Sequence, residues 1–150
     1  MVRARRKARM LTLQVLYEVD SVGHEVEEAM AYLLAQSGLS GENAAFTHDL
    51  VSGVIQNKEK IDYSIQSFAP AWPIGQIPVV DRNILRLAIF EILHDNKVPV
   101  KVVINEAVEL AKAFGSDNSS KFINGVLGSV SDHAVNREIL QGEVENVNHL

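Results

Sequence analysis

Apolar side chains recur every three or four residues through most of the chain, and no stretch alternates cleanly between apolar and polar residues. This is the period of an α-helix that buries one face, so the sequence predicts an all-α fold. A chain of 150 residues is long enough to bury its own core. We expect about seven helices, over residues 3–20, 26–37, 43–56, 59–68, 81–93, 99–114 and from Ser116 to about residue 134.

Proline and glycine gather in one segment, at Pro70, Pro73, Gly75 and Pro78. Because these residues break helices, the segment is predicted to be a helix-free linker. It divides a single predicted domain, residues 1–133, into two small packed bundles, one over about 3–70 and one over about 78–131. Helical periodicity weakens further on, so residues 134–150 are predicted to be a short, frayed C-terminal tail.

Two of the expected helices have faces that can be assigned from spacing. Over residues 3–20, one apolar stripe runs from Ala4 to Val19, and a second consists of Met10, Leu13 and Tyr17, which predicts burial on two sides. In the helix after Pro99, the core face is expected to hold Val103, Ala107, Leu110 and Phe114, with Asn105, Glu109 and Lys112 opposite. Gly115 is expected to end that helix. Gly125 and Gly128 are expected to let another helix approach closely.

Charge is distributed unevenly along the chain. Five of the 14 basic residues lie within seven positions near the N-terminus, and no acidic residue precedes Glu18. The remainder then holds nine basic residues against 19 acidic ones, although the net charge of the whole chain is only −5. Such a cationic end is typical of a polyanion-binding segment, and it is equally typical of a solvated, disordered tail. The first two helical turns are expected to carry charge almost all round.

Several classes of protein are disfavoured by what the sequence lacks. Without cysteine there are no disulfides, cysteine-based zinc sites or thiol catalysis, which fits a cytoplasmic protein. No apolar run is long enough to span a bilayer, and the N-terminus does not match a secretory or transit signal. His48-Asp49 lacks the further ligands of a metal-dependent phosphohydrolase, and Gly125-Val126-Leu127-Gly128 follows no predicted strand. The sequence therefore predicts no enzyme, no metal and no cofactor.

The segment from Ser116 to Phe122 is a second candidate for binding RNA. Free N–H groups at a helix start can hold a phosphate, and Ser116 is the expected N-cap. Lys121 adds positive charge, and Phe122 could stack on an unpaired base. Phe122 is also in phase with Val126 and Val130, so spacing alone favours a core position for its ring.

Three stretches of the chain together resemble the NusB family of transcription antitermination factors. The stretches are Arg5–Tyr17, Asp81–Ala88 and the C-terminal half, where Asn105–Lys112 and Lys121–Leu127 match most closely. Each motif is modest alone, but their order and spacing over about residues 3–130 are specific. The resemblance implies a NusB-like fold of two helical bundles and a protein that is not an enzyme.

The resemblance also implies partners and site residues. The partners are single-stranded boxA-type RNA of ribosomal RNA operon transcripts, the small-subunit ribosomal protein NusE, the RNA polymerase antitermination complex, and in some members a second copy of the chain. Asp81 and Arg82 are expected near the NusE surface. The resemblance also favours a partly exposed position for Phe122. At position 118, where family members often carry an acidic residue, this chain has Asn118. The implied RNA-binding residues are Arg5, Arg6, Lys7, Arg9, Tyr17, Arg86, Lys101, Asn118, Lys121 and Phe122.

Two other functions remain open from the sequence. Similar helical domains resemble the RNA-guiding part of a ribosomal RNA cytosine methyltransferase, but that enzyme family needs a catalytic domain with a nucleophilic cysteine. A protein-protein interaction module is the other alternative, with the basic N-terminus incidental to its function.

Overall fold

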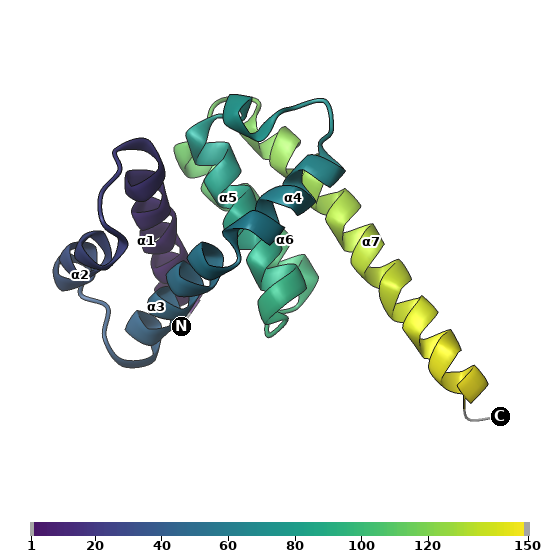
Figure 1. The fold of residues 1–150 in the computed structure, drawn as a ribbon. Coiled ribbons are helices and arrows are strands. Elements are labelled where there is room, and N and C mark those ends of the chain that lie inside the picture. The colour runs from purple at the N-terminus through teal and green to yellow at the C-terminus, as the bar shows by residue number, and fades with distance from the viewer. Residues whose placement is uncertain (1, 149–150) are drawn as a thin grey trace.

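The computed structural model describes residues 2–148, with side chains from Arg3 to Ala134, and shows only helices and turns within that range. Figure 1 shows α1, α2 and α3 on one side and α5, α6 and α7 on the other, with α4 crossing in front of α5 and α6 towards α7. The seven α-helices are α1 (Val2–Ser21), α2 (Val26–Ser37), α3 (Gly41–Gln56), α4 (Lys58–Phe68), α5 (Val79–Ile89), α6 (Val100–Phe114) and α7 (Ser119–Asn148). The all-α prediction is thus confirmed.

Helix ends follow local chemistry. The carboxylate of Glu25 accepts a hydrogen bond of 3.0 Å from the backbone N–H of Glu28, which caps the start of α2. Gly38 ends that helix with φ at 77°, a conformation that glycine adopts without steric cost. Pro78 and Pro99 precede the first residues of α5 and α6, where no intrahelical N–H is required.

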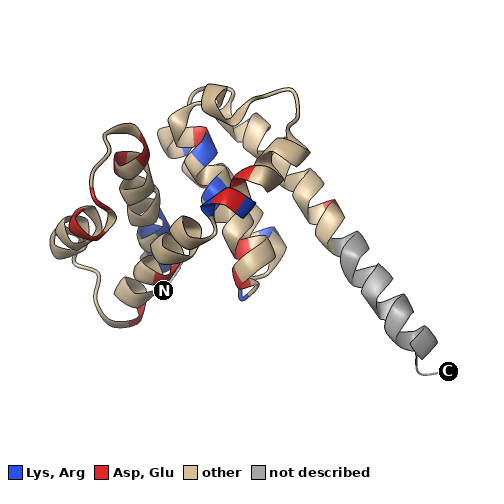
Figure 2. Ribbon diagram, in the orientation of Figure 1, with Lys and Arg blue, Asp and Glu red and all other residues tan. Residues whose placement is uncertain are grey.

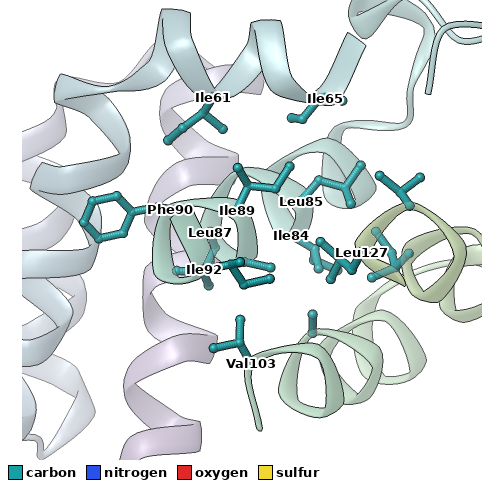
Figure 3. Close-up of a cluster of buried hydrophobic side chains, with 14 of the residues drawn as sticks. Ile61, Ile65, Ile84, Leu85, Leu87, Ile89, Phe90, Ile92, Val103 and Leu127 are labelled. Carbon is teal, nitrogen blue, oxygen red and sulfur yellow. The ribbon is translucent and has the colours of Figure 1, made fainter. Parts of the chain in front are cut away.

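The main core surrounds α5 (Figure 3), which has eight buried residues among its 11. A helix that is buried nearly all round belongs at the centre of a bundle. In the predicted helix over 81–93, the apolar residues Ile84, Leu85, Leu87, Ala88, Ile89 and Ile92 are all buried. The same cluster takes Leu16 from α1, Ile61 from α4 and Leu127 from α7, so both halves of the chain share one core.

α1 contributes to both this core and a second cluster with α2 and α3, built around Val15, Met30 and Val51. Only one of its two predicted stripes is buried as expected. In the second stripe, Met10 and Tyr17 are 38% and 41% exposed. Leu16, which was in neither predicted stripe, is buried. In α6, Phe114 is the last residue of the helix and is likewise 46% exposed. The core prediction was wrong at these positions.

The close approach of two helices occurs at a glycine that spacing did not single out. A Cβ atom on Gly53 of α3 would lie 2.1 Å from the ring of Phe90, so only glycine fits there. At Gly125 and Gly128 no atom lies within 4 Å of the corresponding position, so the expectation of close packing at these two glycines was wrong.

The linker and the last helix also differ from expectation. Ile74–Gln76 forms one turn of 3-10 helix (η1) inside the predicted helix-free segment. α5 continues into a π-helical turn (η2), Phe90–Asp95, which ends at Asn96 with φ at 54°. α7 begins at Ser119, three residues after the predicted N-cap, and is helical to Asn148. The prediction of a frayed tail falls mostly on residues whose side chains lie outside the described range.

Candidate nucleic-acid interface

The basic residues near the N-terminus lie on the first turns of α1, where Figure 2 shows them together, and they contact different neighbours. The guanidinium of Arg6 donates two hydrogen bonds of 3.0 Å to the carboxylate of Glu106 on α6. Its side chain remains 46% exposed, whereas that of Glu106 is 12% exposed. The hydrogen bond from Arg6 to Glu106 and the negative charge of that carboxylate raise the pKa of Arg6. Arg6 is therefore an exposed cation held in one direction.

Arg5 and Lys7 flank Arg6 and differ in their surroundings. The guanidinium carbon of Arg5 lies 4.2 Å from the centre of the Phe46 ring, and Nη1 is 3.5 Å from the backbone oxygen of Glu42. Arg5 is therefore half-buried against α3. Lys7 is exposed. The N-terminal segment is thus an ordered helix whose cations are partly engaged, which argues against a disordered tail.

Arg9 lies inside the protein. It is 5% exposed, and its guanidinium donates hydrogen bonds of 3.0 and 2.9 Å to the carboxylate of Glu91, which is 1% exposed. A phosphate could reach this arginine only if a buried carboxylate gave up its partner, a costly exchange. The expectation that Arg9 belongs to the RNA face, and that this turn is charged all round, does not fit its position.

A groove of about 890 Å³ runs between the start of α1, the polar face of α6 and the first turns of α7. Its cations are Arg6, Lys112 and Lys121, and it also contains the carboxylates of Glu106 and Glu109. The remaining polar side chains come from Asn105, Ser120 and Asn124. The groove therefore combines donors for phosphate with amides that can bond base edges.

The groove brings together only two of the residues that the sequence proposed for RNA, Arg6 and Lys121. Besides the two carboxylates, four polar residues of the groove were not proposed: Asn105, Lys112, Ser120 and Asn124. The signal for two of them was present, because Asn105 and Lys112 are seven residues apart on the polar face of one helix. A ligand site can be recognised in that face only when α7 is placed beside it.

The other proposed residues lie at varying distances from the groove. Lys101 is exposed in the first turn of α6, and Asn118 is exposed directly before α7. Phe122 packs against the core but is only partly buried, in agreement with the partial exposure that the family resemblance favoured. Tyr17 is exposed, but it lies 11 residues beyond Arg6 on α1, a rise of about 16 Å.

The loop before α7 is fixed by buried hydrogen bonds. The hydroxyl of Ser119 donates to Asp81 Oδ1 at 2.7 Å and accepts from the backbone N–H of Ser116 at 2.8 Å. A Cβ atom on Gly115 would lie 2.5 Å from the Ser119 side chain, so glycine permits this close turn. Asp81 is 4% exposed, and its position therefore makes it a support for the loop rather than a surface group.

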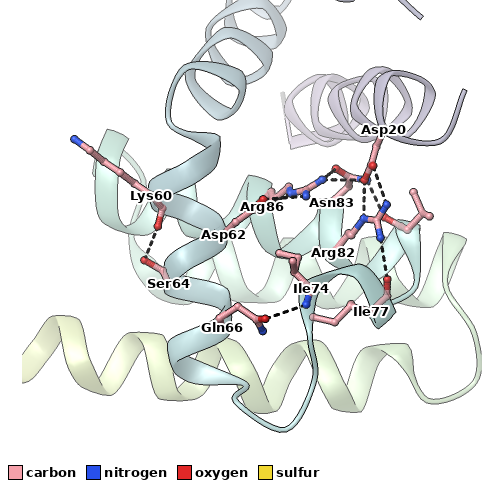
Figure 4. Close-up of polar contacts among 11 residues, drawn as sticks. Asp20, Lys60, Asp62, Ser64, Gln66, Ile74, Ile77, Arg82, Asn83 and Arg86 are labelled. Carbon is pink, nitrogen blue, oxygen red and sulfur yellow. Dashed lines mark hydrogen bonds and ion pairs between the residues drawn. The ribbon is translucent and has the colours of Figure 1, made fainter. Parts of the chain in front are cut away.

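A second polar network joins α1, α4 and α5 (Figure 4). Arg86 is 6% exposed and makes ion pairs of 2.8 Å with both Asp20 and Asp62. Arg82 donates to Asp20 at 2.7 and 2.8 Å. The hydrogen bond from Arg82, with that from Asn83 and the charge of Arg86, holds the pKa of Asp20 well below its usual value. Arg86, expected on the RNA face, thus lies in an internal network.

The described residues hold no cluster of side chains that could bind a metal ion. No three His, Asp or Glu side chains among them lie close enough together to hold a metal ion, and His48 and Asp49 are both exposed. Within the same part of the chain, no helix has the length and apolar character needed to cross a bilayer. The fold and the groove define a small helical protein with a polar, partly cationic binding surface.

Comparison with known proteins identifies the family. The NusB family model matches residues 6–132, and the chain belongs to this family. The transcription antitermination protein NusB of Dehalococcoides mccartyi strain 195 is 53% identical over 131 residues, which cover 87% of this chain and 92% of the relative. That of Chloroflexus aggregans is 48% identical over 128 residues, covering 84% and 85%. The family consists of RNA-binding transcription factors, and its members are not enzymes.

Solved structures of NusB proteins share this fold. A crystal structure of the antitermination factors NusB and NusE in complex with double-stranded RNA contains a chain with 26% identity and a TM-score of 0.81, covering 89% of this chain and 99% of that one. NusB of T. maritima has 30% identity and a TM-score of 0.80, with coverage of 85% and 90%. The predictions of a NusB-like, all-helical protein are therefore confirmed.

Proposed function

We propose that this protein is a transcription antitermination factor that binds single-stranded boxA-type RNA in ribosomal RNA operon transcripts. It acts in the cytoplasm together with NusE, joins the RNA polymerase antitermination complex and suppresses premature termination. The observation that carries the RNA-binding part is the groove in which Arg6, Lys112 and Lys121 lie with side-chain amides. A NusB relative of the same fold forms a complex with NusE and double-stranded RNA, which supports NusE and RNA as partners.

Within this groove, the three cations bind the phosphates of a strand, and Asn105 and Asn124 donate to and accept from base edges. Unpaired bases suit such a site, because their hydrogen-bonding edges are free. Glu106 and Glu109 lie in the same groove and repel phosphate, so the protein alone binds RNA only modestly. That balance favours a requirement for a protein partner.

The RNA-binding residues proposed from the family resemblance are revised by position. Arg6, Lys7, Lys101, Asn118, Lys121 and Phe122 remain on the proposed RNA surface, with half-buried Arg5 and distant Tyr17 at its margins. Arg9 and Arg86 are assigned instead to holding α1 against η2 and α5.

Asp81 and Arg82 keep a proposed role near NusE, at the start of α5. Asp81 acts there through the hydrogen bond that holds Ser119, and Arg82 through its contact with Asp20. Both side chains support the surface from inside. A homodimer remains a separate prediction, tested by light scattering on the purified protein.

The experiment is fluorescence anisotropy of a labelled boxA RNA, with and without NusE, over a range of salt concentrations. A substitution that removes one cation from a phosphate should flatten the log–log slope of affinity against salt by about 0.7. We expect this for Lys121→Ala and Arg6→Ala. Lys60→Ala removes the same charge from the exposed face of α4, outside the groove, and should leave the slope unchanged.

Equal slopes for all three variants would reject the groove as the RNA site. Capture of NusE with no measurable RNA affinity, alone or in the complex, would favour the protein-protein interaction module instead.

A further inference from the structure

The linker carries an exposed aromatic residue that the proposed function does not yet use. Trp72 is the only tryptophan of the chain, and it is 52% exposed. Its indole meets the ring of Phe122 edge to face, with centroids 6.2 Å apart and an angle of 73° between the planes. In such a pair the other ring covers at most one face of the indole. A large apolar face therefore remains open to solvent.

The backbone that carries Trp72 is held firmly. The side-chain amide of Gln66 on α4 donates to the carbonyl oxygen of Trp72 at 2.6 Å and accepts from the N–H of Ile74 at 3.1 Å. The N–H of Trp72 donates to the carbonyl of Ala69 at 3.1 Å. These contacts fix the linker on both sides of the indole, so the ring is presented by an ordered turn.

The aromatic pair of Trp72 and Phe122 lies next to a residue that lines the proposed RNA groove. Phe122 follows Lys121, which lines that groove, and both lie in the first turn of α7 directly after Asn118. Because Lys121 and Phe122 are neighbours in the sequence, a strand whose phosphate is bound by Lys121 lies close to the aromatic pair. Base–aromatic stacking is the usual complement to cations in proteins that bind single strands.

We propose that Trp72 stacks on an unpaired base of the bound RNA and, with Phe122, extends the cationic groove into a base-binding platform. The inference rests on the proposed function, because it needs RNA in the groove. A protein side chain is the alternative occupant of this face. The adjacent cation and amide favour a nucleotide, since an apolar protein anchor gains nothing from them.

The single tryptophan makes the test direct, since tryptophan emission, excited where the three tyrosines do not absorb, reports on Trp72 alone. Unlabelled boxA RNA should quench this fluorescence and protect it from acrylamide, with the same midpoint as the anisotropy titration. RNAs with one abasic nucleotide, moved along the sequence, should abolish the quenching at one position and keep it at the others. Uniform quenching by every abasic RNA would overturn the stacking contact.

Affinity provides a second measurement. Trp72→Ala should weaken RNA binding between about 5-fold and about 150-fold, as expected for one stacked base, and Trp72→Phe should recover part of that affinity. Tyr63→Ala removes another exposed aromatic ring, on α4 and outside the groove, and should change affinity less than 2-fold. If Trp72→Ala lowers the melting temperature strongly, the abasic series on the unmodified protein still decides the question.

The outcomes separate this inference from the proposed function. RNA binding with unchanged fluorescence and unchanged affinity of Trp72→Ala would overturn the inference and leave the groove intact. A Trp72→Ala variant that no longer captures NusE but keeps its RNA affinity would assign the ring to a protein contact. Absence of RNA binding by the unmodified protein and its NusE complex would reject the proposed function itself.

Discussion

The buried ion pair between Arg9 and Glu91 allows a test that separates an internal role for this arginine from a role on RNA. Both side chains are nearly inaccessible, 6% and 1% exposed, and two hydrogen bonds of 2.9 and 3.0 Å join them. In Arg9→Ala the carboxylate of Glu91 stays buried without a partner. Removing one member of such a pair typically costs about 3–5 kcal/mol of unfolding free energy.

This cost can be converted into a change in melting temperature. An unfolding entropy of about 2.1 cal/mol/K per residue gives about 0.3 kcal/mol/K for a chain of 150 residues. The melting temperature of Arg9→Ala should therefore fall by about 10–15 °C, measured by circular dichroism at neutral pH. Because apolar side chains of similar size can replace a buried ion pair at little cost, the double variant Arg9→Met/Glu91→Met should recover most of this stability.

RNA binding completes the comparison. The double variant should keep the salt dependence of boxA affinity close to that of the unmodified protein, since no phosphate ligand has been removed. If Arg9→Ala instead melts within about 3 °C of the unmodified protein and its log–log salt slope flattens by about 0.7, Arg9 contacts RNA and our assignment is wrong.

Two further predictions concern stability. Gly53→Ala places a methyl group against the Phe90 ring and should cost about 1–3 kcal/mol in urea denaturation, whereas Gly125→Ala, with open space around its Cβ, should stabilise by about 0.5–1 kcal/mol; equal effects would contradict the packing described. Since the pKa of Asp20 is lowered by Arg82 and its neighbours, its charge stabilises the fold above the usual carboxyl value of 3.8 and progressively less as pH falls below it. Asp20→Asn should therefore be less stable than the unmodified protein at pH 7, and thermal melts of the two should converge at acid pH, where a constant difference would exclude charge as the cause.

Helical periodicity located all seven described helices. A helix that buries one face needs apolar residues every three or four positions, whichever element it packs against, so the pattern can be seen in the sequence alone. The range predicted for α2 matches the structure, whereas the helix predicted over 81–93 is divided between α5 and η2. Spacing failed where an outcome depends on a distant element. Phe114 is in phase with the core residues of α6, but it is the last residue of that helix and its side chain is exposed.

The candidate site was harder to predict for the same reason. A run of arginines shows where positive charge lies along the chain, but it does not show which carboxylate each one meets. Glu91 is 82 residues from Arg9 in sequence, and Asp20 is 66 residues from Arg86. Trp72 carried no periodic signal at all, because it lies in a linker between helices. Its contact with Phe122 exists only once the chain has folded.

The pairing of Arg6 with Glu106 affects the free energy with which this arginine can bind a phosphate of the proposed RNA. The guanidinium already points in one direction in the free protein, so little rotamer freedom is left to give up on meeting an anion. A phosphate arriving there exchanges one negative partner for another, and the carboxylate it displaces remains only 12% exposed. In the proposed RNA complex, such an exchange yields only a small net gain at Arg6, so this cation orients the strand more than it adds to affinity.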